Sequence, residues 1–220
     1  MNVRKKRLSS EILAMVLVAA VFSISRGADV AIWQNASSGQ SVTSQSKVTI
    51  QGHFYRLDMS PAVTCLLDGD AGYVYQILHP GKVYSRQNLA QFSAASPCAD
   101  ATNAPVATGN SSVIGGYKAY EYRQDLPCGV HIFWVAPDYP GWQKLRQKNA
   151  FVSQIAAKAG FRNFSQELPG MVVQSQSVVD KSSGLSLGGT NESLMETNTL
   201  TLVSIIEVPD DASITQIPAG

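Results

Sequence analysis

Short strand-like runs, rich in apolar residues, recur along most of this chain and are separated at brief intervals by turn-forming residues. Because side chains alternate between the two faces of a strand, residues such as Tyr73, Tyr75 and Ile77 would share one face of a sheet. Asp68-Gly69-Asp70 and His79-Pro80-Gly81 mark turns between such runs. The expected strands cover residues 30–33, 47–59, 63–67, 73–78, 82–85, 117–123, 130–136, 171–179 and 197–208. Their spacing predicts an antiparallel meander rather than alternating strands and helices.

A helical period replaces this alternation between Pro140 and Gly160, two residue types that suit the start and the end of a helix. We therefore expect an α+β, mainly β fold, with one main amphipathic helix packed against the sheet. If the sheet curves around this helix, an apolar pocket forms between them. The residues expected to line it are Trp134, Trp142, Leu145, Val152 and Ile155.

Residues 1–27 have the pattern of a cleavable secretory signal peptide. Arg4-Lys5-Lys6-Arg7 precedes an apolar run over 12–22, which is shorter than the roughly 20 residues of a membrane-spanning helix. Ser25 and Gly27 place small residues before a cleavage site. We expect a periplasmic or secreted protein with no stable membrane span after processing.

The remaining residues, 28–220, suit one β-rich domain with flexible loops near 93–115 and 180–193, where Ser, Gly and Asn accumulate. Of the 17 basic and 16 acidic residues, five basic and one acidic lie in 1–27, so the mature chain has a net charge of −3. This mildly acidic balance gives no reason to expect nucleic acid as a partner.

The candidate catalytic and metal-binding motifs lack the context that their chemistry needs. Gly184-Leu185-Ser186-Leu187-Gly188 matches a hydrolase nucleophile motif, but it lies in a Ser/Gly loop, and that motif requires a histidine later in the chain. All three histidines precede it and fall in separate elements without metal-ligand spacing: His53, His79 and His131. We therefore predict no catalytic residue, no metal site and no cofactor.

The three cysteines allow a disulfide in an exported protein. Cys98 and Cys128 lie in loop-like surroundings, whereas Cys65 lies within a strand-like run. We expect a Cys98–Cys128 disulfide and a buried Cys65 thiol, although spacing alone leaves the other pairings open. Four N-x-S triplets match the glycosylation sequon, and we interpret them as coincidence in a Ser-rich chain with a bacterial-type signal: Asn35, Asn110, Asn163 and Asn191.

Several short motifs follow one another in a distinctive order. They are Tyr55-Arg56-Leu57-Asp58, His79-Pro80-Gly81-Lys82-Val83-Tyr84, Gly116-Tyr117-Lys118-Ala119-Tyr120, Trp134-Val135-Ala136, Leu168-Pro169-Gly170 and Ile217-Pro218-Ala219-Gly220. This order resembles the exported bacterial proteins grouped as domain of unknown function 4412 and, more distantly, the lipoprotein-carrier (LolA/LolB-like) fold. The resemblance implies an open, strongly curved antiparallel sheet, a half-barrel, with a helix in its concavity. It also implies a place in the cell envelope.

Together these observations predict an exported, non-catalytic protein that binds a lipid or another apolar small molecule in the concavity of its sheet. The alternative is a structural or interaction module that docks on another cell-envelope protein through an exposed sheet edge or loop. The alternative predicts a filled concavity and an exposed apolar patch larger than a few hundred Å².

Overall fold

The structure, a computed structural model, describes residues 28–37, 44–89, 103–126, 129–143, 146, 153–154, 167–180, 195–209 and 211–216. These residues form eleven strands and two short 3-10 helices. The strands are β1 (Ala28–Ser37), β2 (Ser44–Gln51), β3 (Phe54–Ser60), β4 (Val63–Asp68), β5 (Tyr73–Leu78), β6 (Val83–Asn88), β7 (Val106–Ile114), β8 (Tyr117–Leu126), β9 (Gly129–Ala136), β10 (Met171–Asp180) and β11 (Met195–Val208). The 3-10 helices are η1 (His79–Gly81) and η5 (Ala212–Thr215).

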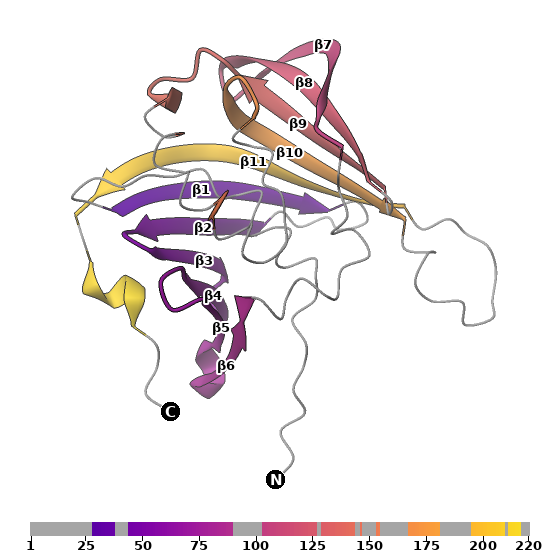
Figure 1. Cartoon of the computed structure of the whole chain (residues 1–220). Coiled ribbons are helices and arrows are strands. Elements are labelled where there is room, and N and C mark those ends of the chain that lie inside the picture. The colour runs from indigo at the N-terminus through magenta and orange to yellow at the C-terminus, as the bar shows by residue number, and fades with distance from the viewer. Residues whose placement is uncertain are drawn as a thin grey trace, which may run out of the picture.

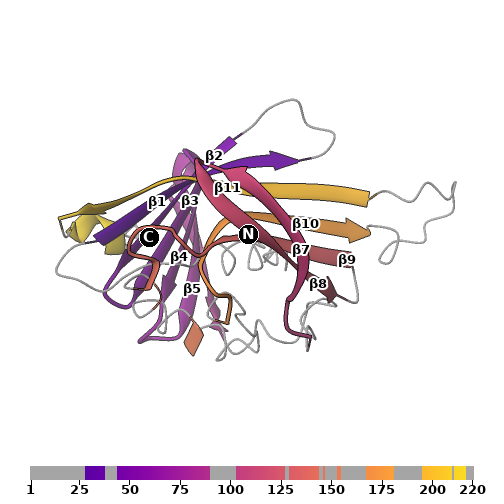
Figure 2. The same ribbon diagram turned by 90° about the horizontal axis from the view of Figure 1, so that it is seen from above.

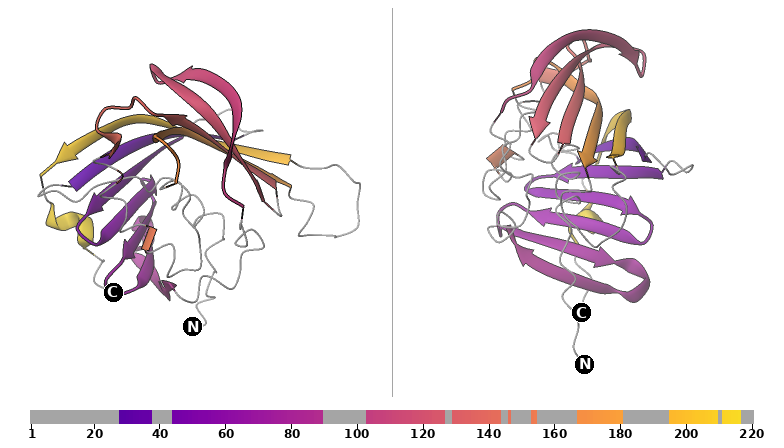
Figure 3. Two further views of the ribbon diagram at one scale, coloured as in Figure 1. Left: turned by 45° about the horizontal axis from the view of Figure 1, so that its top comes forward. Right: turned by 90° about the vertical axis from the view of Figure 1, so that its right-hand side faces the viewer.

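All eleven strands belong to one sheet in the order β6-β5-β4-β3-β2-β1-β11-β10-β9-β8-β7. Every neighbouring pair is antiparallel, which confirms the predicted meander. Strands that follow one another in the chain are neighbours, except that β6 and β7 form the two edges and β1 pairs with β11 (Figure 1). Figures 2 and 3 show that the sheet bends strongly, so that β2–β5 and β7–β10 form two walls.

The predicted amphipathic helix is wrong. No helix of seven or more residues occurs among the residues that the structure describes, and the fold is almost entirely antiparallel sheet. Trp142 follows β9 through two successive turns, in which Tyr139 N–H donates to Ala136 O (3.4 Å) and Trp142 N–H donates to Tyr139 O (3.2 Å). Its indole packs against the main core. The apolar period thus identified a buried contact at Trp142, while residues 144–145, 147–152 and 155–160 of the predicted helix lie outside the described residues.

Two strand boundaries also differ from the sequence prediction. The single expected strand over 47–59 is the hairpin β2–β3, because Gly52 takes a positive φ of 57° at the first of two loop positions. Residues 106–114, expected within a flexible loop, form strand β7. Eight of these nine residues are exposed and Ile114 is half-buried, so pairing with β8 holds the strand although no apolar alternation marks it.

The larger part of the core covers one face of the sheet, which we call the core face. Its buried residues come from both walls: Ala31, Trp33, Val48, Ile50, Tyr55, Leu57, Cys65, Leu67, Val74, Leu89, Ala119, Ala136, Met171, Val173, Leu200 and Leu202. Arg56 lies between Tyr55 and Leu57 and therefore points to the opposite, outer face, where it contacts η5. Because η5 lies outside the bend, the core face is the concave one (Figures 1 and 3).

Two smaller clusters lie outside this core. Phe133, Val135, Leu168 and Val172 form one, and Leu66, Tyr75 and Ile77 form the other on the outer face of β4–β5. None of the helices among the described residues has the length and apolar character needed to cross a membrane. Residues 1–27 and 181–194 lie outside the described residues, so the signal peptide and the second loop stay predictions.

Candidate functional site

The predicted apolar pocket is only partly within the described residues. Trp134 and Trp142 are half-buried, and both pack against the core face. Leu145, Val152 and Ile155 lie outside the described residues, as do Cys98 and Cys128. The pocket and the disulfide therefore stay predictions. Cys65 is free and buried, as expected, and burial raises the pKa of its thiol to about 12.

Half-buried aromatic rings border the core face near the end of β9. The rings of Tyr117 and Tyr139 lie 4.8 Å apart, and both side chains pack against the core with Trp142. Burial raises the pKa of Tyr139, and the nearby Tyr117 raises it by a smaller amount. The Arg146 guanidinium lies 5.8 Å from the centre of the Trp142 ring, within cation–π range. We call this group the aromatic border; it combines apolar surface with a positive charge and consists of Tyr117, Tyr139, Trp142 and Arg146.

Trp33 is the largest side chain buried in the core face, with no exposed surface. Its backbone pairs with Ser46 of β2 and Leu202 of β11, next to a β-bulge after Ile32. Among the residues that the structure describes, none accepts a hydrogen bond from the indole Nε1–H of Trp33. A buried donor without an acceptor costs about 1–3 kcal/mol, so this position can gain energy from a group that supplies one.

The outer face carries a polar hollow of about 480 Å³ beside the β3–β4 turn. Strands β1–β4, the β3–β4 turn and η1 supply its lining residues: Ile32, Gln45, Ser46, Lys47, Arg56, Asp58, Ser60, Pro61, Thr64 and His79. Lys47, Asp58 and Thr64 lie directly across from one another on three adjacent strands, with His79 at the end of β5. The sheet register thus gathers side chains that are far apart in the sequence.

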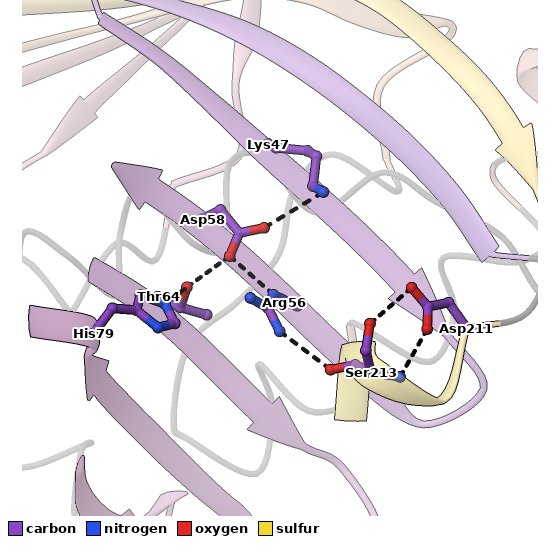
Figure 4. Close-up of polar contacts among 7 residues, drawn as sticks. All are labelled: Lys47, Arg56, Asp58, Thr64, His79, Asp211 and Ser213. Atoms are coloured by element: carbon purple, nitrogen blue, oxygen red, sulfur yellow. Dashed lines mark hydrogen bonds and ion pairs between the residues drawn. The ribbon is translucent and has the colours of Figure 1, made fainter. Parts of the chain in front are cut away.

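Asp58 is the centre of the polar contacts in the hollow (Figure 4). Its Oδ1 accepts hydrogen bonds from Arg56 Nε (2.9 Å) and Thr64 Oγ1 (2.6 Å), and its Oδ2 lies 3.7 Å from Lys47 Nζ. Thr64 Oγ1 is also 2.8 Å from His79 Nε2. Because an ionised carboxylate only accepts, the single hydroxyl hydrogen of Thr64 goes to Asp58. His79 Nε2 therefore donates to Thr64, which fixes the histidine tautomer.

The same network holds η5 against the sheet. Arg56 Nη1 donates to Ser213 O (3.5 Å), and Asp211 N–H donates to Gln51 Oε1 (3.0 Å). Asp211 accepts from Ser213 N–H and from the Ser213 hydroxyl (Figure 4). The Ser213 hydroxyl and backbone hydrogen bonds lower the pKa of Asp211, and the positive charges of Lys47 and Arg56 lower it further.

This arrangement does not fit acid–base or nucleophilic catalysis. Thr64 is 1 % exposed, so its hydroxyl is not accessible to a substrate, and three donors already surround the Asp58 carboxylate. His53 lies elsewhere, with Nδ1 3.2 Å from Asp70 and Nε2 3.9 Å from Asp68. Within the described part of the chain, no group of three or more His, Cys, Asp or Glu side chains is placed to hold a metal ion.

Sequence reasoning missed both Trp33 as an unpartnered donor and the polar hollow. In the sequence, Trp33 is indistinguishable from any other aromatic residue of a core. A sequence does not show where an N–H group lacks an acceptor. One feature of the sequence indicated the hollow: Lys47, Asp58 and Thr64 are polar residues within strand-like runs. Only the register, Lys47 opposite Asp58 and Asp58 opposite Thr64, brings them together.

Neither a protein-family model nor a curated protein matches the sequence, so the resemblance to domain of unknown function 4412 is not confirmed. Among solved structures, the chain is similar to PNGF-II in a P21 crystal form, with 11% sequence identity over 86% of this chain and a TM-score of 0.42. The chain spans 30% of the length of PNGF-II.

Two further similar structures match along nearly their whole length. A DUF1329 family protein from Desulfovibrio piger has 10% identity and a TM-score of 0.35, over 90% of this chain and 92% of that protein. A LolA superfamily protein from Nitrosomonas europaea has 12% identity and a TM-score of 0.32, over 92% of this chain and 97% of that protein.

Proposed function

We propose that the protein is an exported, non-catalytic binding protein of the cell envelope. Its ligand is an amphipathic molecule, such as a lipid or a fatty acid, held against the core face. The observation that carries the proposal is the Trp33 indole N–H, which lies in the apolar core face without an acceptor in the described part of the chain. An acyl chain would contact the surrounding apolar side chains, and its ester or carboxyl oxygen would accept from Trp33.

The aromatic border offers the point of entry for this ligand. Val48 and Ile50 have no exposed surface, so a ligand reaches the core face only by displacing side chains that pack on it. Tyr139 and Trp142 are only partly buried and are accessible first. Arg146 beside Trp142 would attract a carboxylate or phosphate headgroup while the apolar chain enters.

Lipid extraction and native mass spectrometry of protein purified from the envelope or the medium test the proposal. We expect a bound amphiphile or, after delipidation, tight rebinding of a long-chain fatty acid. In ¹⁵N-indole spectra the Trp33 Nε1–H resonance, assigned with Trp33→Phe, should move downfield on binding. A protein that stays empty and shows no indole shift with saturating fatty acid would overturn the proposal.

The exposed edge strand β7 favours a second candidate function, docking on another envelope protein. Its nine residues include no charged side chain, and Val106 and Val113 are 67% and 72% exposed. Natural edge strands usually carry charges that prevent pairing with another strand. Capture of one envelope protein by the wild type but not by Val113→Lys would favour this function over ligand binding, and equal capture by both would exclude β7 as the docking edge.

A further inference from the structure

The polar hollow on the outer face has more hydrogen-bond donors than acceptors. Arg56 carries five N–H groups, of which Asp58 and Ser213 accept two among the described contacts. Lys47 carries three, and its ammonium is within ion-pair distance of Asp58 alone in the described part of the chain. Asp58 Oδ1 already accepts twice, from Arg56 and Thr64. A molecule that brings acceptors fits this hollow better than one that brings donors.

The charge of the lining residues also favours a ligand that brings acceptors, because it favours an anion. Lys47 and Arg56 are positive and Asp58 is negative, so the hollow carries one surplus positive charge when His79 is neutral. One surplus charge matches a monoanion better than a dianion. Asp211 lies outside the lining, but its carboxylate is close enough to respond to Lys47 and Arg56 and therefore competes with a bound anion.

The shape and the apolar lining limit the size of the ligand. A volume of about 480 Å³ lies within the range of small-molecule sites, which is about 300–1,000 Å³. Ile32 and Pro61 line the hollow together with the charged groups. An anion with a short apolar substituent would use both kinds of surface, whereas inorganic phosphate would use only the polar one.

From these observations we infer that the outer-face hollow binds a small organic monocarboxylate, with its carboxylate between Lys47 and Arg56 and its apolar part against Ile32 and Pro61. The hollow lies on the opposite face of the sheet from the core face. Binding there is therefore independent of the proposed binding of an amphiphile on the core face.

Titration with butyrate, acetate and inorganic phosphate at constant ionic strength tests this inference through the backbone amide resonances of β2, β3 and β4 and the Arg56 Nε–H resonance. We expect butyrate to bind more tightly than acetate or phosphate, and the shifts to centre on Lys47, Arg56 and Thr64. Tighter binding of phosphate, or shifts spread evenly over the surface, would overturn the inference.

Two variants with opposite effects add an electrostatic test. Lys47→Gln removes one cation and should weaken butyrate binding about fivefold, as expected for an exposed charge pair. Asp211→Asn removes the competing charge and should strengthen binding, because Asn keeps the acceptor for Ser213 N–H. Lys118→Gln, on β8 of the other wall, is the control and should leave binding unchanged. Equal affinities in all three variants would overturn the site.

Discussion

Lowering the pH should destabilise the protein through one buried histidine, His131. It lies on β9, its Nε2 is 2.9 Å from Ser175 Oγ, and its ring lies 4.2 Å from that of Phe133. Burial lowers the pKa of His131 from 6.5 to about 4, because the charged imidazolium would lose its hydration. The folded protein therefore holds this side chain neutral at pH values where the unfolded chain already binds a proton.

The sign and the size of the effect follow from this difference in pKa. As the pH falls through 6.5 the unfolded state takes up the proton first, so stability is complete above that pH and is lost progressively down to about pH 4. The free energy of unfolding falls by about 2 kcal/mol at pH 5 and by about 3 kcal/mol well below the folded-state pKa. Against a typical stability of about 5–15 kcal/mol, this is a large fraction.

Urea unfolding at pH 7 and pH 5 measures the effect directly. With a slope of about 2 kcal/mol per molar urea, the midpoint should fall by about 1 M between the two pH values. His131→Gln keeps a polar group near Ser175 without a titrating ring, and its midpoint should change much less. An equal fall in both proteins, or an NMR titration that gives His131 an ordinary pKa in the folded state, would refute the reasoning.

Three further predictions concern stability and reactivity. Gly170→Ala should lower stability by about 1–3 kcal/mol, or roughly 2–12 °C in Tm, because its new Cβ would lie 2.6 Å from Ala136 O and 2.8 Å from Pro137 Cα. Gly81→Ala, whose Cβ would meet only the Val83 side chain at 3.3 Å, is the matched control, and an equal Tm for both variants would contradict the steric argument. Cys65, with a thiol pKa of about 12, should resist iodoacetamide at pH 8 in the folded protein and react after unfolding, as peptide mapping would show. Thr64→Val should cost about 1–2 kcal/mol in denaturant unfolding, because it removes the hydroxyl between Asp58 and His79 without changing the side-chain volume; an unchanged midpoint would mean that this hydroxyl contributes nothing to stability.

Local sequence was enough to predict most of the sheet. The runs around Val63–Asp68 and Tyr73–Leu78 form β4 and β5, because they are rich in the β-branched and aromatic residues that favour strands. Strand β7 escaped prediction because its side chains are almost all exposed and its stability comes from backbone pairing with β8. The predicted main helix is wrong, since no helix of seven or more residues occurs among the described residues, although the apolar period around Trp142 does mark burial against the core.

The candidate site was much harder to predict than the fold, because it depends on register. Asp58 and Thr64 are six residues apart and His79 follows Thr64 by fifteen, and no local pattern predicts a hydrogen-bonded chain among them. A shift of one residue between β3 and β4 would turn Thr64 to the core face and break the chain. The unpartnered Trp33 indole likewise depends on every neighbour that surrounds it in the folded state.

The pairing of β1 with β11 has a consequence for how the chain folds. Of the eleven strands, β11 is synthesised last, yet it lies in the interior of the sheet, between β1 and β10, rather than at an edge. During synthesis, β1–β6 can assemble early, but the side of β1 that β11 later covers stays open until residue 208 is available. Contacts this distant in sequence form slowly, so the exposed β1 edge is a site for wrong pairing in the meantime. A circular permutant that starts at β7 and joins β11 directly to β1 would make every strand pair sequential, and it should fold faster with the same final structure.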